Sequence, residues 1–268
     1  MENTPDAEPR DTDFVTALAR GMRILACFSA NDEELGNLQI SRRAQLPPAT
    51  VARLTHTLVE LGYLRTTPGR QKYALSAQVL SLGYPVLARL PERELARLHV
   101  KALADETRGS VCLALAEGLH AVYVEVSRGR DAGQFPDIGV RRPLLDSSVG
   151  RALYVGMGPQ QQASVLNQCC LNEPDRATTL RRSASLAVAD YVRYGMCRTT
   201  GLAVPGWSAM AMPVRGLGNR RFAVSLGVQT QSIPEDEFVR RIGLPLSNAV
   251  SRMASAFRAA ERSEEGIH

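Results

Sequence analysis

The chain has 268 residues, of which 44% are hydrophobic, and its 32 basic and 27 acidic residues give a net charge of +5. No window approaches the roughly 18–20 consecutive apolar residues of a membrane span, and the acidic N-terminus lacks the pattern of a signal peptide, so we expect a cytoplasmic protein. Five cysteines without C-x-x-C spacing indicate reduced thiols rather than a disulfide framework or a zinc knuckle. The length predicts two domains.

Charged residues are unevenly distributed. Residues 1–13 are rich in Asp and Glu, which is typical of a disordered tail. Between Asn37 and Leu75, in contrast, Glu60 is the single acid among several basic residues. The net charge alone names no partner, but this basic segment coincides with a short predicted helix.

Three short helices are predicted before Tyr63. Apolar residues share one face of residues 14–28, and residues 31–34 break that helix. Asn37 is placed to cap a second helix, which a turn at residues 44–46 connects to a third. The third helix spans about 48–61 and carries an apolar stripe with helical periodicity: Val51, Leu54, Leu58 and Leu61.

The third helix has clear ends and is followed by a hairpin. Pro47 and Pro48 favour a helix start, while Gly62 can adopt the left-handed conformation that ends a helix. The segments YLRTT and KYAL then read as two strands around a Pro68-Gly69 turn. Helix, helix-turn-helix and basic hairpin, in that order, predict a winged helix-turn-helix.

The outer face of the third helix has the dimensions and chemistry to read DNA. Thr50 and Arg53 lie near its N-terminal end, where short polar or basic side chains can reach bases in the major groove. His56 is either a further DNA contact or an ordinary, partly buried histidine. Phosphate contacts are expected from the surrounding basic residues: Arg42, Arg43, Arg65, Arg70 and Lys72. The alternative is a winged helix used only for protein contacts, with Arg53 solvated.

The second half of the chain predicts an α+β domain. Residues 75–90 form a helical linker, weakened by Gly83 and Pro85 and able to pair with its copy in a dimer. Two strands, SVCLALA and HAVYVEV, follow a helix over Glu92–Arg108, and WSAMAMPV and FAVSLGV form a later hairpin. The remaining predicted helices span Ser147–Met157, Gln160–Cys169, Thr179–Tyr194 and Pro234–Arg258.

The chain resembles the IclR family of bacterial transcription regulators from Phe14 to Phe257. The resemblance is carried by ALARGMRIL, LPPATVARLTHTLVELGYL and GRQKYALS, and in the second domain by VYVEV and GVRRPLLDSSVGRAL. It implies a winged helix-turn-helix domain, a linker helix and a GAF-like effector domain, without a cofactor. It further implies homodimers or dimers of dimers that bind near-palindromic operator DNA and respond to a small organic acid or aromatic metabolite.

The sequence also predicts domain bounds. The predicted segments are an acidic tail (1–13), a DNA-binding domain (14–75), a linker helix (76–91), an effector-binding and oligomerisation domain (92–260) and a flexible tail (261–268). Two departures from the family pattern stand out: Pro48-Ala49 replaces a basic residue and a serine, and Gln45 stands where the turn often has Gly.

The family's effector-binding positions fall on eight residues: Gln134, Ser147, Ser148, Val149, Gly150, Thr199, Trp207 and Ala209. Hydroxyl and N–H groups at a helix start favour a carboxylate. The alternative is that Asp146 or Ser147 simply caps that helix. Relatives that bind small acids often carry Asp in place of Thr199 and Cys in place of Ala209, so we expect a more apolar ligand here, such as an aromatic acid that stacks on Trp207.

Other functions have weaker support. There is no G-x-S-x-G elbow around Ser147 or Ser148, and His99 and His120 belong to no recognisable triad, so we expect no enzyme. A small-molecule hydrolase is therefore the weaker alternative. A thiol- or metal-responsive regulator based on Cys169 and Cys170 stays open.

Overall fold

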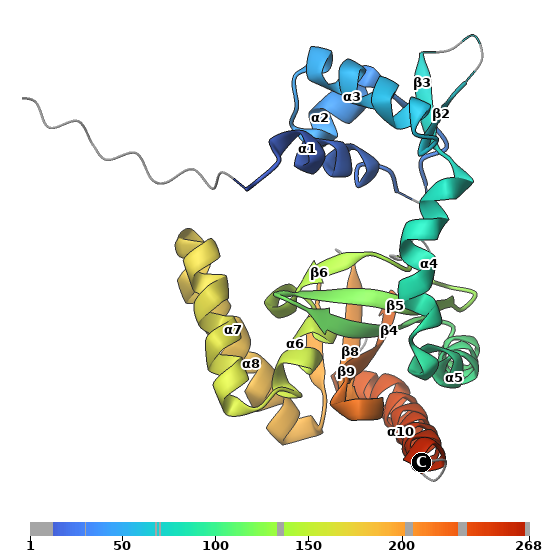
Figure 1. Ribbon diagram of the computed structural model, residues 1–268. Coiled ribbons are helices and arrows are strands. Elements are labelled where there is room, and N and C mark those ends of the chain that lie inside the picture. The colour runs from blue at the N-terminus through green and yellow to red at the C-terminus, as the bar shows by residue number, and fades with distance from the viewer. Residues whose placement is uncertain are drawn as a thin grey trace, which may run out of the picture. The chain divides into compact units, whose positions relative to one another are not determined.

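The computed structural model describes residues 13–29, 31–67, 69, 71–132, 137–201, 206–229 and 235–265. The chain divides into two compact units, Met1–Ala88 and Arg89–His268 (Figure 1). Two of the predicted site residues, Arg70 and Gln134, lie outside the described residues.

The first unit is a winged helix-turn-helix, as predicted. It combines three helices with a three-stranded antiparallel sheet in the order β1-β3-β2, in which β1 lies between α1 and α2 in the chain. The short strand β1 was not predicted, because two residues are too few to show alternation. The elements are α1 (Thr16–Leu25), β1 (Leu35–Gly36), α2 (Asn37–Ala44), α3 (Pro48–Glu60), β2 (Leu64–Thr66) and β3 (Lys72–Leu75).

The core of this unit gathers one apolar residue or more from each helix and from two strands: Ile24, Leu35, Ile40, Ala44, Leu46, Val51, Leu58 and Leu64. The composition of this core corrects the predicted apolar faces of the first and third helices. Leu61 of the third stripe is 56% exposed because α3 has ended at Glu60. Of the apolar face predicted over residues 14–28, Phe14, Leu18 and Met22 are exposed, whereas Leu25 and Phe28 pack against this core beside the buried Ile24.

The turn chemistry also corrects one expectation. Gly36, not Asn37, is the N-cap of α2, and its backbone N–H donates to Gln39 Oε1 at 2.8 Å. Asn37 lies inside the helix, and its side chain donates to the carbonyl of Pro48 at 3.1 Å, which ties the starts of α2 and α3 together. Gln45 adopts φ = 53° in the turn, the left-handed conformation that explains why glycine suits this position.

The linker divides into two parts. Ser76 caps a 3-10 turn (Ala77–Val79), and α4 (Leu80–Ala88) follows, with Pro85 inside it. Large apolar side chains along α4 are exposed to solvent, namely Leu80, Leu82, Tyr84 and Val86.

The second unit is built on a six-stranded antiparallel sheet in the order β6-β5-β4-β9-β8-β7. The two edge strands, β6 and β7, were not predicted. A π-helical segment (Val239–Gly243) interrupts the predicted final helix. The elements are α5 (Pro91–Thr107), β4 (Ser110–Glu117), β5 (His120–Arg128), β6 (Arg141–Pro143), α6 (Ser148–Val155), α7 (Pro159–Asn172), α8 (Ala177–Tyr194), β7 (Cys197–Thr200), β8 (Trp207–Arg215), β9 (Arg221–Gln229), α9 (Glu235–Phe238) and α10 (Leu244–Glu265).

Helices cover both faces of this sheet (Figure 1). On one face, α6 packs on β8 and β9, and α7 and α8 extend the same apolar cluster, which includes Cys112, Ala211 and Ala223 of the strands. On the other face, α5 packs on β4 and β5, and α10 packs on β8 and β9. The ring centroids of Phe222 in β9 and Phe257 in α10 are 6.4 Å apart. The predicted effector residues on the strands, Thr199, Trp207 and Ala209, lie on the α6 face.

Candidate nucleic-acid interface and effector site

The outer face of α3 is open to solvent. Val51, Thr55 and Leu58 face inward, and the hydroxyl of Thr55 donates to the carbonyl of Val51 at 2.9 Å, so this buried polar group is satisfied inside the helix. Arg53 and His56 are exposed on the opposite face, while Thr50 is half-buried. His56 therefore does not fit the description of a partly buried histidine.

A shallow hollow lies between α1 and α3. It is lined by Ala17, Arg20, Thr50, Arg53, Leu54 and Thr57. Arg20 is an exposed cation beside two predicted base contacts, and it was not predicted from the sequence. The apolar periodicity of α1 could not have revealed Arg20, because only tertiary packing brings α1 beside α3.

Other predicted phosphate contacts surround α3. Arg42 and Arg65 are exposed, and neither makes an ion pair with the part of the chain that the structure describes. Lys72 Nζ lies 3.9 Å from a carboxylate oxygen of Glu34, and the Glu34 carboxylate also accepts a hydrogen bond from the hydroxyl of Thr67. Glu34 thus connects both sides of the wing to the segment before α2.

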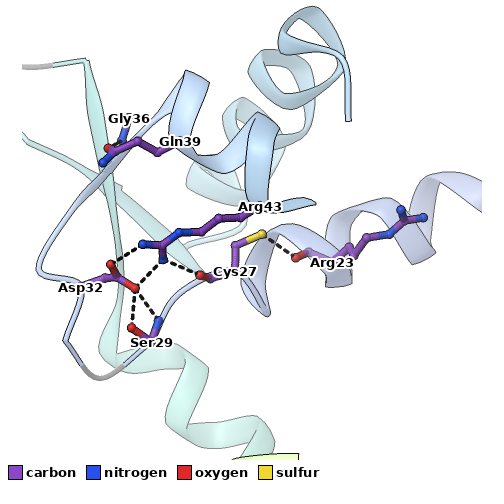
Figure 2. A network of polar contacts seen from close by, with 7 residues as sticks. All are labelled: Arg23, Cys27, Ser29, Asp32, Gly36, Gln39 and Arg43. Carbon is purple, nitrogen blue, oxygen red and sulfur yellow. Dashed lines mark hydrogen bonds and ion pairs between the residues drawn. The ribbon is translucent and has the colours of Figure 1, made fainter. Parts of the chain in front are cut away.

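Arg43 has a structural task (Figure 2). Its guanidinium donates to both carboxylate oxygens of Asp32, at 2.6 and 2.9 Å, and to the carbonyl of Cys27 at 3.0 Å. Ser29 donates its N–H and its hydroxyl to the same carboxylate. These donors, with Arg43 first, hold the pKa of Asp32 well below its usual range.

This network connects the loop after α1 to the last turn of α2. We expected Arg43 to be free to bind a phosphate. Instead, its guanidinium already donates to both carboxylate oxygens of Asp32. Position 43 cannot be distinguished from position 42 in the sequence, since the two arginines are adjacent and only the helix phase directs one toward Asp32. A phosphate contact by Arg43 stays a prediction.

Ser147 caps the start of α6, as in the alternative that Asp146 or Ser147 serves only as a helix cap. The Ser147 hydroxyl accepts the N–H of Gly150 at 3.2 Å, and the Ser148 hydroxyl lies 3.1 Å from that of Ser225 on β9. Gly150 has a packing role, because an added Cβ would lie 2.3 Å from the carbonyl of Leu144. The first turn of α6 still leaves the N–H groups of Ser148 and Val149 without acceptors inside the helix.

The sheet brings the other predicted effector residues to the same side. Thr199 on β7 pairs with Ala209 on β8, and Ala209 pairs with Gly227 on β9. Trp207 precedes Ala209 by two residues, so the two side chains share a face. Ser148 reaches this face through Ser225. The structure therefore collects Ser148, Thr199, Trp207 and Ala209 on one side of the sheet.

A buried arginine lies beside this group. Arg151, in α6, is 8% exposed; its Nε donates to the Ser183 hydroxyl at 3.0 Å and its Nη1 to the carbonyl of Arg198 at 3.2 Å. Burial lowers the pKa of Arg151, but a guanidinium stays charged in proteins. The positive charge adds to the helix dipole at the start of α6. It was not singled out from the sequence, where one arginine inside a helix carries no distinct signal.

Comparison with known proteins decides the family. Residues 17–68 match the IclR helix-turn-helix domain, and residues 85–255 match the domain described as bacterial transcriptional regulator IclR C-terminal. The chain belongs to the IclR family. The HTH-type transcriptional regulator TsaQ1/TsaQ2 of Comamonas testosteroni is 31% identical to this IclR-family protein over 264 residues, which cover 96% of the chain and 94% of the relative.

Two solved structures share the architecture of this IclR-family chain. An IclR family transcriptional regulator from Brucella abortus has a TM-score of 0.70 and 34% identity, over 92% of this chain and 94% of the other. An IclR homologue from Microbacterium hydrocarbonoxydans, solved in complex with 4-hydroxybenzoate, has a TM-score of 0.67 and 24% identity, over 91% and 100% of the two chains. The second likeness concerns the fold alone.

Further properties of this IclR-family protein concern membranes, metals and thiols. Within the described ranges, no helix combines the length and apolar character needed to cross a membrane. Over the same residues, no three His, Cys, Asp or Glu side chains gather as a metal site would require. Burial raises the pKa of the Cys112 and Cys197 thiols to about 12 and also raises the pKa of the Cys169 thiol.

Proposed function

We propose that this protein is a one-component transcription regulator that binds near-palindromic operator DNA in the cytoplasm. The observation that carries the proposal is α3, whose inner face is buried in the core and whose outer face presents Arg53 and His56 to solvent. A helix exposed in this way fits the major groove of B-DNA. Thr50 and Arg53 would contact bases, with His56 beside them, and phosphates would be contacted by Arg42, Arg65, Arg70 and Lys72.

The active form would be a homodimer or a dimer of dimers. Large apolar side chains of α1 and α4 are exposed in the single chain, and exposed apolar clusters support an interface. Pairing of two chains places two winged helices on two half-sites about 34–36 Å apart, or a multiple of that distance. The twofold symmetry of the dimer would then match the near-palindrome.

The effector would be a small organic acid, and we favour an aromatic one. The uncapped N–H groups of Ser148 and Val149 suit a carboxylate. Ala209 carries only a methyl group, and Trp207, on the same face, offers a ring for stacking. The likeness in fold to a homologue solved with 4-hydroxybenzoate supports this choice.

Effector binding would alter DNA binding through a difference in affinity between two states of the dimer. A coupling free energy of about 1–3 kcal/mol would change operator affinity about 5- to 150-fold, which is sufficient for regulation. An effector that lowers operator affinity would release DNA, and one that raises operator affinity would favour DNA binding.

The alternatives are less well supported. Catalysis by Ser147 or Ser148 lacks a base, since these hydroxyls meet the Gly150 N–H and Ser225 rather than a histidine. A thiol response at Cys169 and Cys170 requires a reactive thiolate, whereas both residues are buried and burial raises the pKa of the Cys169 thiol.

A gel-shift experiment with the full chain tests the proposal. The upstream intergenic DNA and a random duplex of equal length are compared, with and without 4-hydroxybenzoate or another small acid. We expect selective binding of the intergenic DNA and a change in affinity with at least one acid. Arg181→Ala is a matched control, because this arginine is exposed on α8 in the second unit. Equal affinity for both duplexes under all conditions contradicts the regulator, and selective binding that no acid alters contradicts only the effector response.

A further inference from the structure

An acidic residue stands beside the wing, where the proposed partner is itself negatively charged. Glu34 directly precedes β1, and 21% of its side chain is exposed. One of its carboxylate oxygens lies 3.9 Å from Nζ of Lys72, a proposed phosphate contact. A carboxylate near a phosphate is repelled by it, so Glu34 should weaken DNA binding unless its contacts within the protein outweigh the repulsion.

Glu34 contacts both ends of the loop between β2 and β3, which we call the wing loop (residues 67–71). Its Oε1 accepts a hydrogen bond from the hydroxyl of Thr67, the first residue of the loop. Its Oε2 is the oxygen near Lys72, the residue that follows the loop. The N–H of Thr67 also donates to the carbonyl of Lys72 at 3.2 Å. The carboxylate therefore joins the two sides of the wing at the point where the wing loop begins.

The hydrogen bond with Thr67 is the stronger of the two contacts. A hydrogen bond to an ionised acceptor is roughly twice as strong as one between neutral groups. The ion pair with Lys72 is long, and 43% of the Lys72 side chain is exposed, so solvent screens it. Glu34 thus holds the wing loop mainly through Thr67, and the Lys72 ammonium keeps donors for a phosphate.

The backbone that carries Glu34 is anchored in the core of the first unit. Leu35, the next residue, is 1% exposed and belongs to the same apolar cluster as Val51 of α3. Leu35 also pairs with Tyr73 in the β1–β3 ladder. The position of Glu34 is therefore set by the core on which α3 packs, and the carboxylate connects the wing loop to that core.

We infer that Glu34 is a positioning residue for DNA recognition. Its carboxylate holds the wing loop where Arg70 and Lys72 reach phosphates while α3 lies in the major groove. An acid at this place thereby strengthens DNA binding, although the phosphates repel its charge. The inference rests on the proposed DNA-binding function, and it adds a residue that neither the charge pattern nor the family resemblance indicated.

The first test compares the wild type with Glu34→Ala on operator and random duplexes over a range of salt, by fluorescence anisotropy. If Glu34 acted only through its charge, its removal would raise both affinities and steepen the slope of log affinity against log salt. We expect the opposite result. Both affinities should fall about three- to tenfold, as the loss of one hydrogen bond supplies, and the slope should become shallower by about one as a phosphate contact is lost.

Glu33→Ala is the matched control. Glu33 is the adjacent acid in the chain, is exposed, and forms no ion pair within the described ranges. Its removal should leave the affinities unchanged or raise them slightly. Affinities of Glu34→Ala at or above those of the wild type overturn the inference, and so does an equal weakening by Glu33→Ala.

The second test reaches the same contact from the wing. Thr67→Val removes the hydroxyl and retains the shape of the side chain, so it should weaken binding to both duplexes as Glu34→Ala does. Because both substitutions break one hydrogen bond, the double variant should bind no more weakly than either single variant. Additive losses overturn the inference. Circular dichroism shows whether each variant is folded, and Thr67→Val carries the test if Glu34→Ala does not fold.

The wild type in the same titrations separates this inference from the proposed function. Binding of the wild type to neither duplex overturns the proposed function together with the role of Glu34. Selective binding by the wild type that both single variants leave unchanged overturns the role of Glu34 alone.

Discussion

Arg53 and Arg65 are both exposed arginines of the winged helix-turn-helix, yet they stand on elements that meet DNA differently. Arg53 is on α3, where base edges are in reach, whereas Arg65 is on the β2 strand of the wing. Arg53→Ala should therefore reduce the preference for operator over random DNA by about 1–3 kcal/mol. Fluorescence anisotropy with both duplexes measures this preference.

Arg65→Ala should weaken operator and random DNA alike and lower the slope of log affinity against log salt by about one. A salt titration of the same two duplexes gives that slope. The role assignments are contradicted if both variants change the operator-to-random ratio equally.

Asp32 gives the first unit a defined response to pH. Its carboxylate is held by Arg43 and Ser29, which lowers its pKa in the folded state. A lowered folded pKa contributes stability above the unfolded value, near pH 4, and that contribution is lost as the pH falls through the folded pKa. Asp32→Asn should therefore be less stable than the wild type at pH 7, and the two should converge as the pH falls below about 4.

Urea unfolding of both proteins between pH 7 and pH 2 measures this convergence. Glu33→Gln is the control, since Glu33 is an exposed carboxylate outside the network of Figure 2. A constant difference between wild type and Asp32→Asn across the whole range would show that the carboxylate charge is irrelevant.

For single residues, the sequence predicts which side chains are exposed better than it predicts which groups those side chains contact. Arg53 was expected on the outer face of α3 because helical periodicity assigns faces directly. The ion pair of Arg43 with Asp32 depends on tertiary packing. No local pattern around Arg43 could have predicted it.

Among the elements, the start of α5 is fixed by a buried carboxylate. Glu92 is 0% exposed, and its Oε1 accepts the N–H of Leu217 at 2.8 Å and lies 3.0 Å from Nε of Arg220. Arg220 also donates to the carbonyl of Arg89, the residue that directly follows α4 in the chain. The β8–β9 turn is thereby attached to the residue where the linker ends.

Glu92→Ala should lower the free energy of unfolding by about 1–3 kcal/mol, because it leaves the Leu217 N–H buried without an acceptor. Chemical denaturation measures the loss. Glu94→Ala, on the exposed side of the same helix turn, should change stability by less than about 0.5 kcal/mol. Equal effects of the two substitutions would mean that the buried carboxylate contributes nothing specific.

Helix ends were predictable where the sequence carries strong signals. The predicted bounds of α3, 48–61, agree with the observed Pro48–Glu60 to within one residue. The agreement is close because two prolines mark the start of the helix and a glycine marks its end. The helix predicted over residues 14–28 is the shorter Thr16–Leu25, and part of its apolar face, at Leu18 and Met22, is exposed. Periodicity shows which residues share a face, but not what covers that face. The edge strands β6 and β7 were too short to show alternation.

For the molecule as a whole, the exposed apolar residues of α1 and α4 lead to a prediction about assembly. Leu18 is 65% exposed and Leu80 is 72% exposed. If these residues lie in an interface between two chains, Leu18→Glu with Leu80→Glu should shift the protein toward monomer and weaken operator binding, with the fold of the single chain unchanged. Sedimentation velocity and circular dichroism measure these properties.

Leu98→Glu is a matched control, because Leu98 is similarly exposed but lies on α5 in the second unit. The assembly prediction is contradicted if the double variant keeps the wild-type sedimentation coefficient.

The sequence is most informative about the molecule as a whole, since the motifs of both domains are sufficient to indicate the family. Assembly is harder to infer, because an interface depends on the surfaces of two chains.

Reading of DNA by α3 is the central claim, and it is tested most directly by the ratio of operator to random DNA affinity as salt is raised. For the wild type, we predict affinities that fall with salt on both duplexes, with the operator bound at least about 10³-fold more tightly at physiological salt. Arg53→Ala should retain the salt dependence and lose most of the ratio. A ratio near one for the wild type at every salt concentration would contradict the claim.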